Sequence, residues 1–214
     1  MQPVLENGTP ASLFDAVGGK LGIAESTLPF VAFTSVWSLT DRNVLAGGIV
    51  AVAITLALAI ARLLRRQTLQ FAFSGVIGVA IGAFVATRTG KAEDFFLPGI
   101  LINAASAVAY LTSIIVRRPL LGLIVSTMTG EGRSWYEDPV RRRAYTRASW
   151  IWVALFLFRL SIQLPLYLTG SVGPLAVAKI VTGIPLFALG LWLSYLWLRP
   201  LIASVPESAV TPAT

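Results

Sequence analysis

Residues 44–64 read VLAGGIVAVAITLALAIARLL, which is the most uniformly apolar stretch of the chain. A helix needs about 20 mostly apolar residues to cross a bilayer, because the hydrocarbon core offers backbone groups no hydrogen-bond partner outside the helix. The stretch has that length and predicts a membrane-spanning helix. It therefore sets the fold class that we expect for the whole chain, an all-α, polytopic membrane helix bundle.

Five further stretches of similar character predict five further spans. They run over residues 21–39, 69–86, 95–116, 145–168 and 173–198. We expect about six transmembrane helices in one domain over residues 21–199, between a polar tail at 1–20 and a second tail at 200–214. The start of the chain lacks a basic segment followed by an apolar one, so we expect no cleaved signal peptide.

Residues 119–129 contain an apolar segment, Leu120 to Met128, that is too short to cross a bilayer. It follows Arg117-Arg118-Pro119, and proline disfavours an unbroken continuation of the helix before it. We interpret the segment as one short interfacial or half-inserted helix. The alternative is a bent extension of the fourth span.

The composition narrows the function classes. Of the 214 residues, 56% are hydrophobic and 13% are charged, whereas a soluble domain carries about 25% charged residues. The chain has no Cys and no His, which excludes disulfides, thiol nucleophiles, imidazole groups and the usual zinc or haem sites. We also find no clustered acid and nucleophile, so we expect no enzymatic activity, no metal and no cofactor.

The basic residues lie mostly on one side of the predicted spans. The opposite side has three, Arg42, Arg88 and Lys91. By the positive-inside rule, this asymmetry predicts a multi-pass protein of the cytoplasmic (inner) membrane with both termini in the cytoplasm. The twelve residues on the basic side are Lys20, Arg62, Arg65, Arg66, Arg117, Arg118, Arg133, Arg141, Arg142, Arg143, Arg147 and Arg199.

The net charge of +7 follows mainly from this topology signal and from attraction to anionic headgroups. Our candidates for docking a lipid headgroup or a partner are Arg117, Arg118, Arg141, Arg142 and Arg143. Arg141, Arg142 and Arg143 have an alternative role, as solvated charges that only fix the orientation of the chain in the membrane. We expect the lipid bilayer and membrane proteins of the cell envelope as partners. We expect no nucleic acid, because no folded basic domain is long enough to bind one.

Small and aromatic residues predict packing and interface contacts. Gly75, Gly78 and Gly82 of the third span are spaced for close approach of a neighbouring helix, within one chain or between copies. Five aromatic residues near the basic side are typical of the belts that lie at membrane interfaces. They are Trp135, Tyr136, Trp192, Tyr195 and Trp197.

Two basic residues, Arg159 and Lys179, lie inside predicted spans and away from their ends. A charge at mid-bilayer costs at least about 2.5–3.5 kcal/mol, so each is a functional candidate. Arg159 is roughly 13 Å from the outer end of its span at helical rise, and Gln163 follows one turn later on the same face. Lys179 is near enough to the outer end of its span to reach Glu93 and Asp94, its expected partners.

These side chains form a candidate intramembrane polar cluster, whose members are Glu25, Asp94, Asn103, Arg159, Gln163 and Lys179. One interpretation is a polar path for an ion or a small anionic solute. The other is a buried clamp that fixes helix register, which membrane hydrogen bonds of about 0.6–2 kcal/mol make feasible. The lack of a carboxylate or His near mid-depth disfavours a proton relay.

Two short segments of the chain resemble each other, which suggests an internal repeat. Residues 25–29 read ESTLP and residues 94–98 read DFFLP, and each opens an apolar run with the pattern acid-x-x-Leu-Pro. A duplicated three-helix unit, a 3+3 repeat in inverted orientation, is common in transporters. The alternative is that acids and proline are simply ordinary residues at helix starts.

Four segments carry a family resemblance. They read AESTLPFVAFTSVWSLT (24–40), TRTGKAEDFFLPGILINA (87–104), RRPLLGLIVS (117–126) and WIWVALFLFRLSIQLPLYL (150–168). Together they resemble an uncharacterised actinobacterial family of integral membrane proteins, known only as a domain of unknown function. The resemblance covers about residues 18–200 and brings no established catalytic residues.

A second resemblance rests on the order of three features along the chain. These are Leu28-Pro29, the basic break from Arg62 to Arg66, and Arg117-Arg118-Pro119-Leu120. In this order the chain is similar, more distantly, to the intracellular septation protein A family of inner-membrane proteins. The similarity implies a non-enzymatic factor of the cell envelope or of division that binds membrane or protein partners. Residues 87–94 and Arg159 depart from that family. The alternative function is a small transporter or channel with a polar path around Arg159.

Overall fold

The computed structural model describes residues 19–64, 70–129 and 134–202. Every regular element in these ranges is a helix, so the predicted all-α class is confirmed there. The described contacts divide the chain into two compact units. Of the described residues, the first unit comprises 19–64, 70–101 and 162–188, and the second comprises 102–129, 134–161 and 189–202.

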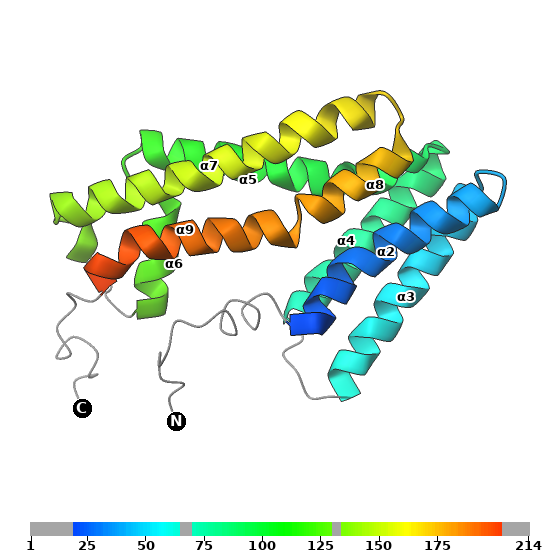
Figure 1. Cartoon of the computed structure of the whole chain (residues 1–214), viewed down its shortest axis with the longest axis horizontal. Coiled ribbons are helices and arrows are strands. Elements are labelled where there is room, and N and C mark those ends of the chain that lie inside the picture. Colours follow the sequence, from blue (N-terminus) through cyan, green and yellow to red (C-terminus); the bar gives the residue numbers. More distant parts are fainter. Residues whose placement is uncertain (1–18, 65–69, 130–133, 203–214) are drawn as a thin grey trace. The chain divides into compact units, whose positions relative to one another are not determined.

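The first unit begins with three consecutive helices that pack side by side (Figure 1). They are α2 (Gly19–Leu39), α3 (Val44–Leu64) and α4 (Gln70–Thr89). The turn between α2 and α3 is tight, because Asp41 and Arg42 adopt left-handed backbone angles, with φ of 48° and 63°. Asn43 then caps α3, since its Oδ1 accepts a hydrogen bond of 3.0 Å from the backbone N–H of Ala46.

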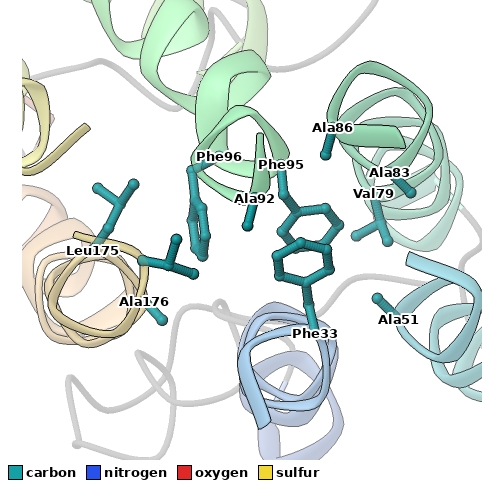
Figure 2. Packing of buried hydrophobic residues seen from close by; sticks show 11 residues of the cluster. Phe33, Ala51, Val79, Ala83, Ala86, Ala92, Phe95, Phe96, Leu175 and Ala176 are labelled. Carbon is teal, nitrogen blue, oxygen red and sulfur yellow. The ribbon is translucent and has the colours of Figure 1, made fainter. Parts of the chain in front are cut away.

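A short 3₁₀ helix, η1 (Ala92–Phe96), and α8 (Val172–Val181) complete the first unit. Figure 2 shows Phe95 of η1 lying against Phe33 of α2, with ring centroids 3.9 Å apart and planes 7° apart. Phe96 lies beside Leu175 and Ala176 of α8 in the same view. The loop that follows α4 is therefore held by burial of aromatic rings.

The glycines of α4 differ in their surroundings. A Cβ added at Gly82 would lie 2.5 Å from the carbonyl oxygen of Phe95, so η1 approaches α4 closely at this residue. A Cβ added at Gly75 or Gly78 would meet nothing within 4 Å. Within the described chain, the close approach predicted for all three glycines is therefore found only at Gly82.

The second unit contains α6 (Leu120–Thr129), η2 (Ser134–Tyr136) and most of α5 (Leu97–Ile115), α7 (Pro139–Leu168) and α9 (Ile184–Ile202). Its core gathers around Trp135, which is fully buried. The ring of Trp135 packs on Gly122, where an added Cβ would lie 2.7 Å from it. The prediction that Trp135 belongs to an interface belt is therefore wrong, because the small residue on α6 makes room for the indole inside the unit.

Between α5 and α6 the chain turns sharply. The N–H of Arg118 donates to the carbonyl of Ser113 over 2.9 Å, and the N–H of Arg117 donates to that of Ile114 over 3.0 Å. This is the bonding pattern that closes a helix end with a left-handed residue. The segment after Pro119 is thus a separate helix, α6, which runs at a steep angle to α7 and α9 (Figure 1).

Four helical segments are long and apolar enough to cross a membrane, Val44–Leu64, Ala92–Ile115, Pro139–Leu168 and Val172–Arg199. Two further apolar stretches, Ser26–Leu39 of α2 and Gly75–Thr89 of α4, have their side chains described over shorter lengths. These elements correspond in position to the six predicted spans. The count of six membrane crossings stays a prediction.

The last predicted span is divided into two helices, α8 and α9. Pro185 has no N–H to donate to the carbonyl of Val181, and the N–H of Gly183 instead donates to Ile180 over 3.2 Å. Proline is well placed in the first turn of the helix that follows. The division at Thr182–Gly183 therefore follows from local chemistry that the apolar pattern does not reveal.

Candidate functional site

A basic pocket of about 230 Å³ lies in the second unit. Its lining comes from the end of α5 and the early turns of α7. We call it the arginine pocket, and the lining residues are Ile114, Arg117, Arg142, Arg143, Thr146 and Arg147. It thus brings together three of the five basic docking residues proposed from the sequence, and it adds Arg147.

Local chemistry positions the α7 side of the pocket. Asp138 caps the helix, because its Oδ1 accepts a hydrogen bond of 2.8 Å from the N–H of Val140. Pro139 follows as the first helical residue, where its fixed φ suits the helix and its missing N–H costs nothing. From this start, helical periodicity places Arg143 and Arg147 on one face of α7.

The charge of the pocket is not balanced within the described residues. Arg141 forms an ion pair with Asp138, with 3.5 Å between Nε and Oδ2. Across the same ranges the structure gives no ion pair for the four arginines of the pocket. Arg142 and Arg143 also lie near the N-terminal end of α7, where the helix dipole is positive and favours an anion. The pocket therefore presents four cationic side chains that lack a described counter-ion.

Arg117 holds an uncommon backbone conformation at the pocket. Its φ is +60°, in the left-handed region that glycine usually occupies at a helix end. A residue with a side chain pays roughly 1–2 kcal/mol there. The turn therefore keeps an arginine where glycine would be less strained.

Among the polar cluster residues, Arg159 and Asn103 lie in the second unit and contact each other. Nη1 of Arg159 donates to Oδ1 of Asn103 over 3.4 Å. Nε of Arg159 is buried and has no hydrogen-bond partner among the described residues. The pair links α7 to α5, and it leaves part of the guanidinium unsatisfied.

Two other cluster residues, Gln163 and Asp94, form hydrogen bonds within the first unit. Nε2 of Gln163 donates to Oγ1 of Thr182 over 3.0 Å, and the Thr182 hydroxyl donates to the carbonyl of Ala178 over 2.7 Å. The Tyr167 hydroxyl donates to Oδ1 of Asp94 over 2.5 Å. Both contacts join the last two turns of α7 to other elements of the unit, because Thr182 follows α8 and Asp94 belongs to η1.

The ammonium group of Lys179 lies 4.3 Å from the centroid of the Phe30 ring, within the range of a cation–π contact. It also lies against Gly99, where an added Cβ would collide with it. Glu25 belongs to α2, but its side chain lies outside the described residues.

Sequence reasoning missed several participants of these sites. Arg147 was treated only as part of the topology signal, although its i+4 spacing from Arg143 is a readable sign of a shared face. The pairing of Asp94 with Tyr167, and of Gln163 with Thr182, had no sequence signal, because each joins separate elements. Arg118 and Arg141 are not part of the pocket lining.

The long apolar helices and the basic clusters at their ends fit one class, the multi-pass helical membrane proteins. Residues 17–204 match the family described as Protein of unknown function (DUF3159), and the chain belongs to this family. The predicted resemblance to a membrane family of unknown function is thereby confirmed. No curated protein and no solved structure matches the chain.

Proposed function

We propose that this protein is a non-enzymatic component of the cytoplasmic membrane that holds an anionic membrane or protein partner at its basic face. One observation carries the proposal, the convergence of Arg117, Arg142, Arg143 and Arg147 on one pocket. Guanidinium groups form two parallel hydrogen bonds with phosphate or carboxylate, so such a pocket is suited to recognise anions.

The chemistry of the lining favours binding over catalysis. Arginine stays protonated at physiological pH and does not exchange protons as an acid or base. The hydroxyl of Thr146 donates to the carbonyl of Arg142 on its own helix over 2.8 Å. A nucleophile needs an adjacent base to be activated, and none of the lining residues is one.

A role in the cell envelope or in division is supported by the similarity to the septation family. The expected arrangement is six spans with both termini in the cytoplasm, which would place the arginine pocket at the cytoplasmic surface. There it would face the anionic leaflet and the soluble parts of envelope proteins.

Complementation of cells that lack the protein tests this function. The variant combines Arg142→Gln and Arg143→Gln, and the matched control, which removes the same number of charges, combines Arg118→Gln and Arg141→Gln outside the pocket. We expect the control to restore normal cell length and resistance to cell-wall antibiotics, and the pocket variant to fail at equal membrane abundance. Full restoration by the pocket variant would contradict the proposed function.

A transporter or channel for a small anion is the second candidate, and the environment of Arg159 favours it. Its Nε has no partner in the described chain, so the guanidinium retains capacity for a passing anion. Anion flux into proteoliposomes, measured for wild type and Arg159→Gln, tests this candidate. If the protein is a transporter, the wild type should give an anion flux above that of empty liposomes, and Arg159→Gln should abolish this flux. A wild-type flux equal to that of empty liposomes would exclude transport of the anions used.

A further inference from the structure

We infer that the arginine pocket binds the headgroup of a phospholipid that carries two phosphodiester groups, the cardiolipin class. The inference rests on the proposed docking function of this face and names its ligand. It follows from the number of charges, from where the pocket lies on its helices and from the backbone of Arg117.

The charges of the pocket require more than one anionic group. Four arginine residues, Arg117 from the turn after α5 and three from α7, line one pocket of about 230 Å³. Their like charges repel one another. A headgroup with a single phosphodiester would bring one negative charge. Two linked phosphodiesters bring two and supply enough oxygen acceptors for several guanidiniums at once, so this headgroup offsets more of the repulsion.

The location of the pocket suits a lipid. Ile114 and Arg117 lie where the apolar helix α5 ends, which is where a headgroup meets the edge of the hydrocarbon. Ile115, Val116 and Val140, neighbours of the pocket residues along the chain, are strongly exposed. A ligand with phosphates and acyl chains would match both the charged lining and these apolar side chains.

The size of the pocket agrees with this assignment. Its volume of about 230 Å³ is below the range of roughly 300–1,000 Å³ that is typical of sites enclosing a whole small molecule. A headgroup whose acyl chains remain outside needs less enclosed volume. Basic pockets at the cytoplasmic side of membrane helices are suited to lipids with several phosphate charges.

The backbone of Arg117 is an independent observation. Non-glycine residues in the left-handed region persist where their surroundings or their function hold them there. Here the strained position, with φ of +60°, carries a side chain that lines the pocket. Glycine would relieve the strain but would remove a guanidinium from the site. We infer that the arginine contributes to headgroup binding.

Native mass spectrometry of the detergent-purified full chain tests the inference. The lipids are tetraoleoyl cardiolipin and dioleoyl phosphatidylglycerol, and inorganic pyrophosphate is the soluble competitor. We expect cardiolipin to bind about tenfold more tightly than phosphatidylglycerol, and millimolar pyrophosphate not to displace it. Equal affinity for the two lipids would overturn the assignment to two phosphodiesters. Displacement by pyrophosphate would assign the pocket to a soluble phosphate compound instead.

Three variants locate the binding. Arg143→Gln should weaken cardiolipin binding about tenfold, the effect of losing one hydrogen-bonded charge, whereas Arg118→Gln should change it less than twofold. Arg117→Gly should weaken it similarly while leaving the unfolding temperature unchanged or raised, because glycine adopts the left-handed turn without strain. Equal losses for Arg118→Gln and Arg143→Gln would show diffuse attraction and overturn the inference.

The lipid assay and the complementation assay distinguish failure of this inference from failure of the proposed function. If the pocket variants lose cardiolipin but still complement, the lipid site stands and the proposed function does not. If they fail to complement although wild type shows no preference between the two lipids, the proposed function stands and this inference does not.

Discussion

At the scale of single residues, sequence spacing predicts which side chains share one face of a helix but not which residues they contact on other helices. The stripe on α7 that contains Arg159 and Gln163 could be read from the sequence, because helical periodicity places residues four apart on one face. Their partners, Asn103 and Thr182, lie on or after other helices. Packing decides these pairs, so sequence reasoning listed Asn103 as a cluster member but did not identify its contact and missed Thr182.

A double-mutant cycle on Arg159 and Asn103 measures whether the pair is a structural clamp. We expect Arg159→Met and Asn103→Leu each to lower stability, because each leaves a polar group without its partner. The double variant should lose less than the sum, with a coupling of about 0.6–1.7 kcal/mol. The measurement is reversible unfolding in mixed micelles.

The exposed Arg143→Ala serves as the control for this cycle, since its side chain lies outside the pair. It should change stability by less than about 0.5 kcal/mol. A coupling energy of zero between Arg159 and Asn103 would argue against the clamp and in favour of an arginine kept for a solute.

At the scale of elements, apolar length located the helices well and their internal breaks poorly. The expected span over residues 44–64 coincides with α3. The division between α8 and α9 was missed, because Thr182 and Gly183 are tolerated inside apolar runs and the effect of Pro185 depends on where the helix restarts. The short segment after Pro119 was identified correctly as distinct from a full span, and the structure shows a separate helix, α6.

Two glycines of α4 provide a matched test of element packing. Gly82→Ala should destabilise the protein by about 1–3 kcal/mol, because its Cβ would meet the carbonyl oxygen of Phe95 and force η1 away. Gly78→Ala should be neutral or stabilising by up to about 1 kcal/mol, since alanine is the better helix former and the space is open.

The comparison is made by unfolding both variants under identical detergent conditions. A loss at Gly78 as large as that at Gly82 would indicate that α4 packs on another copy of the chain at Gly78. That result would contradict the expected neutral effect and would be checked by cross-linking.

At the scale of the whole molecule, the absence of cysteine makes topology directly measurable. Thr40→Cys lies between α2 and α3, and Glu137→Cys lies between α6 and α7, and both residues are exposed. With six crossings, three helices separate these positions. They should then be on opposite sides of the membrane, with Thr40→Cys outside by the positive-inside rule.

Labelling of intact cells with an impermeant maleimide checks this arrangement. We expect reaction at Thr40→Cys in intact cells and at Glu137→Cys only after permeabilisation. If only the four long apolar helices crossed, two crossings would separate the positions and both would label from the same side. That outcome would contradict the six-span arrangement.

The sequence by itself determined that this is an all-helical chain with apolar spans and basic ends, because span length and loop charge are local properties of the chain. It also singled out Arg159 and the arginines near residues 117 and 142. Only the tertiary structure decided that Arg117 lines the same pocket as three arginines of α7. It also decided that Arg141, next to them in sequence, pairs with Asp138 instead. Such meetings depend on how separate helices pack, and helical periodicity carries no information on that.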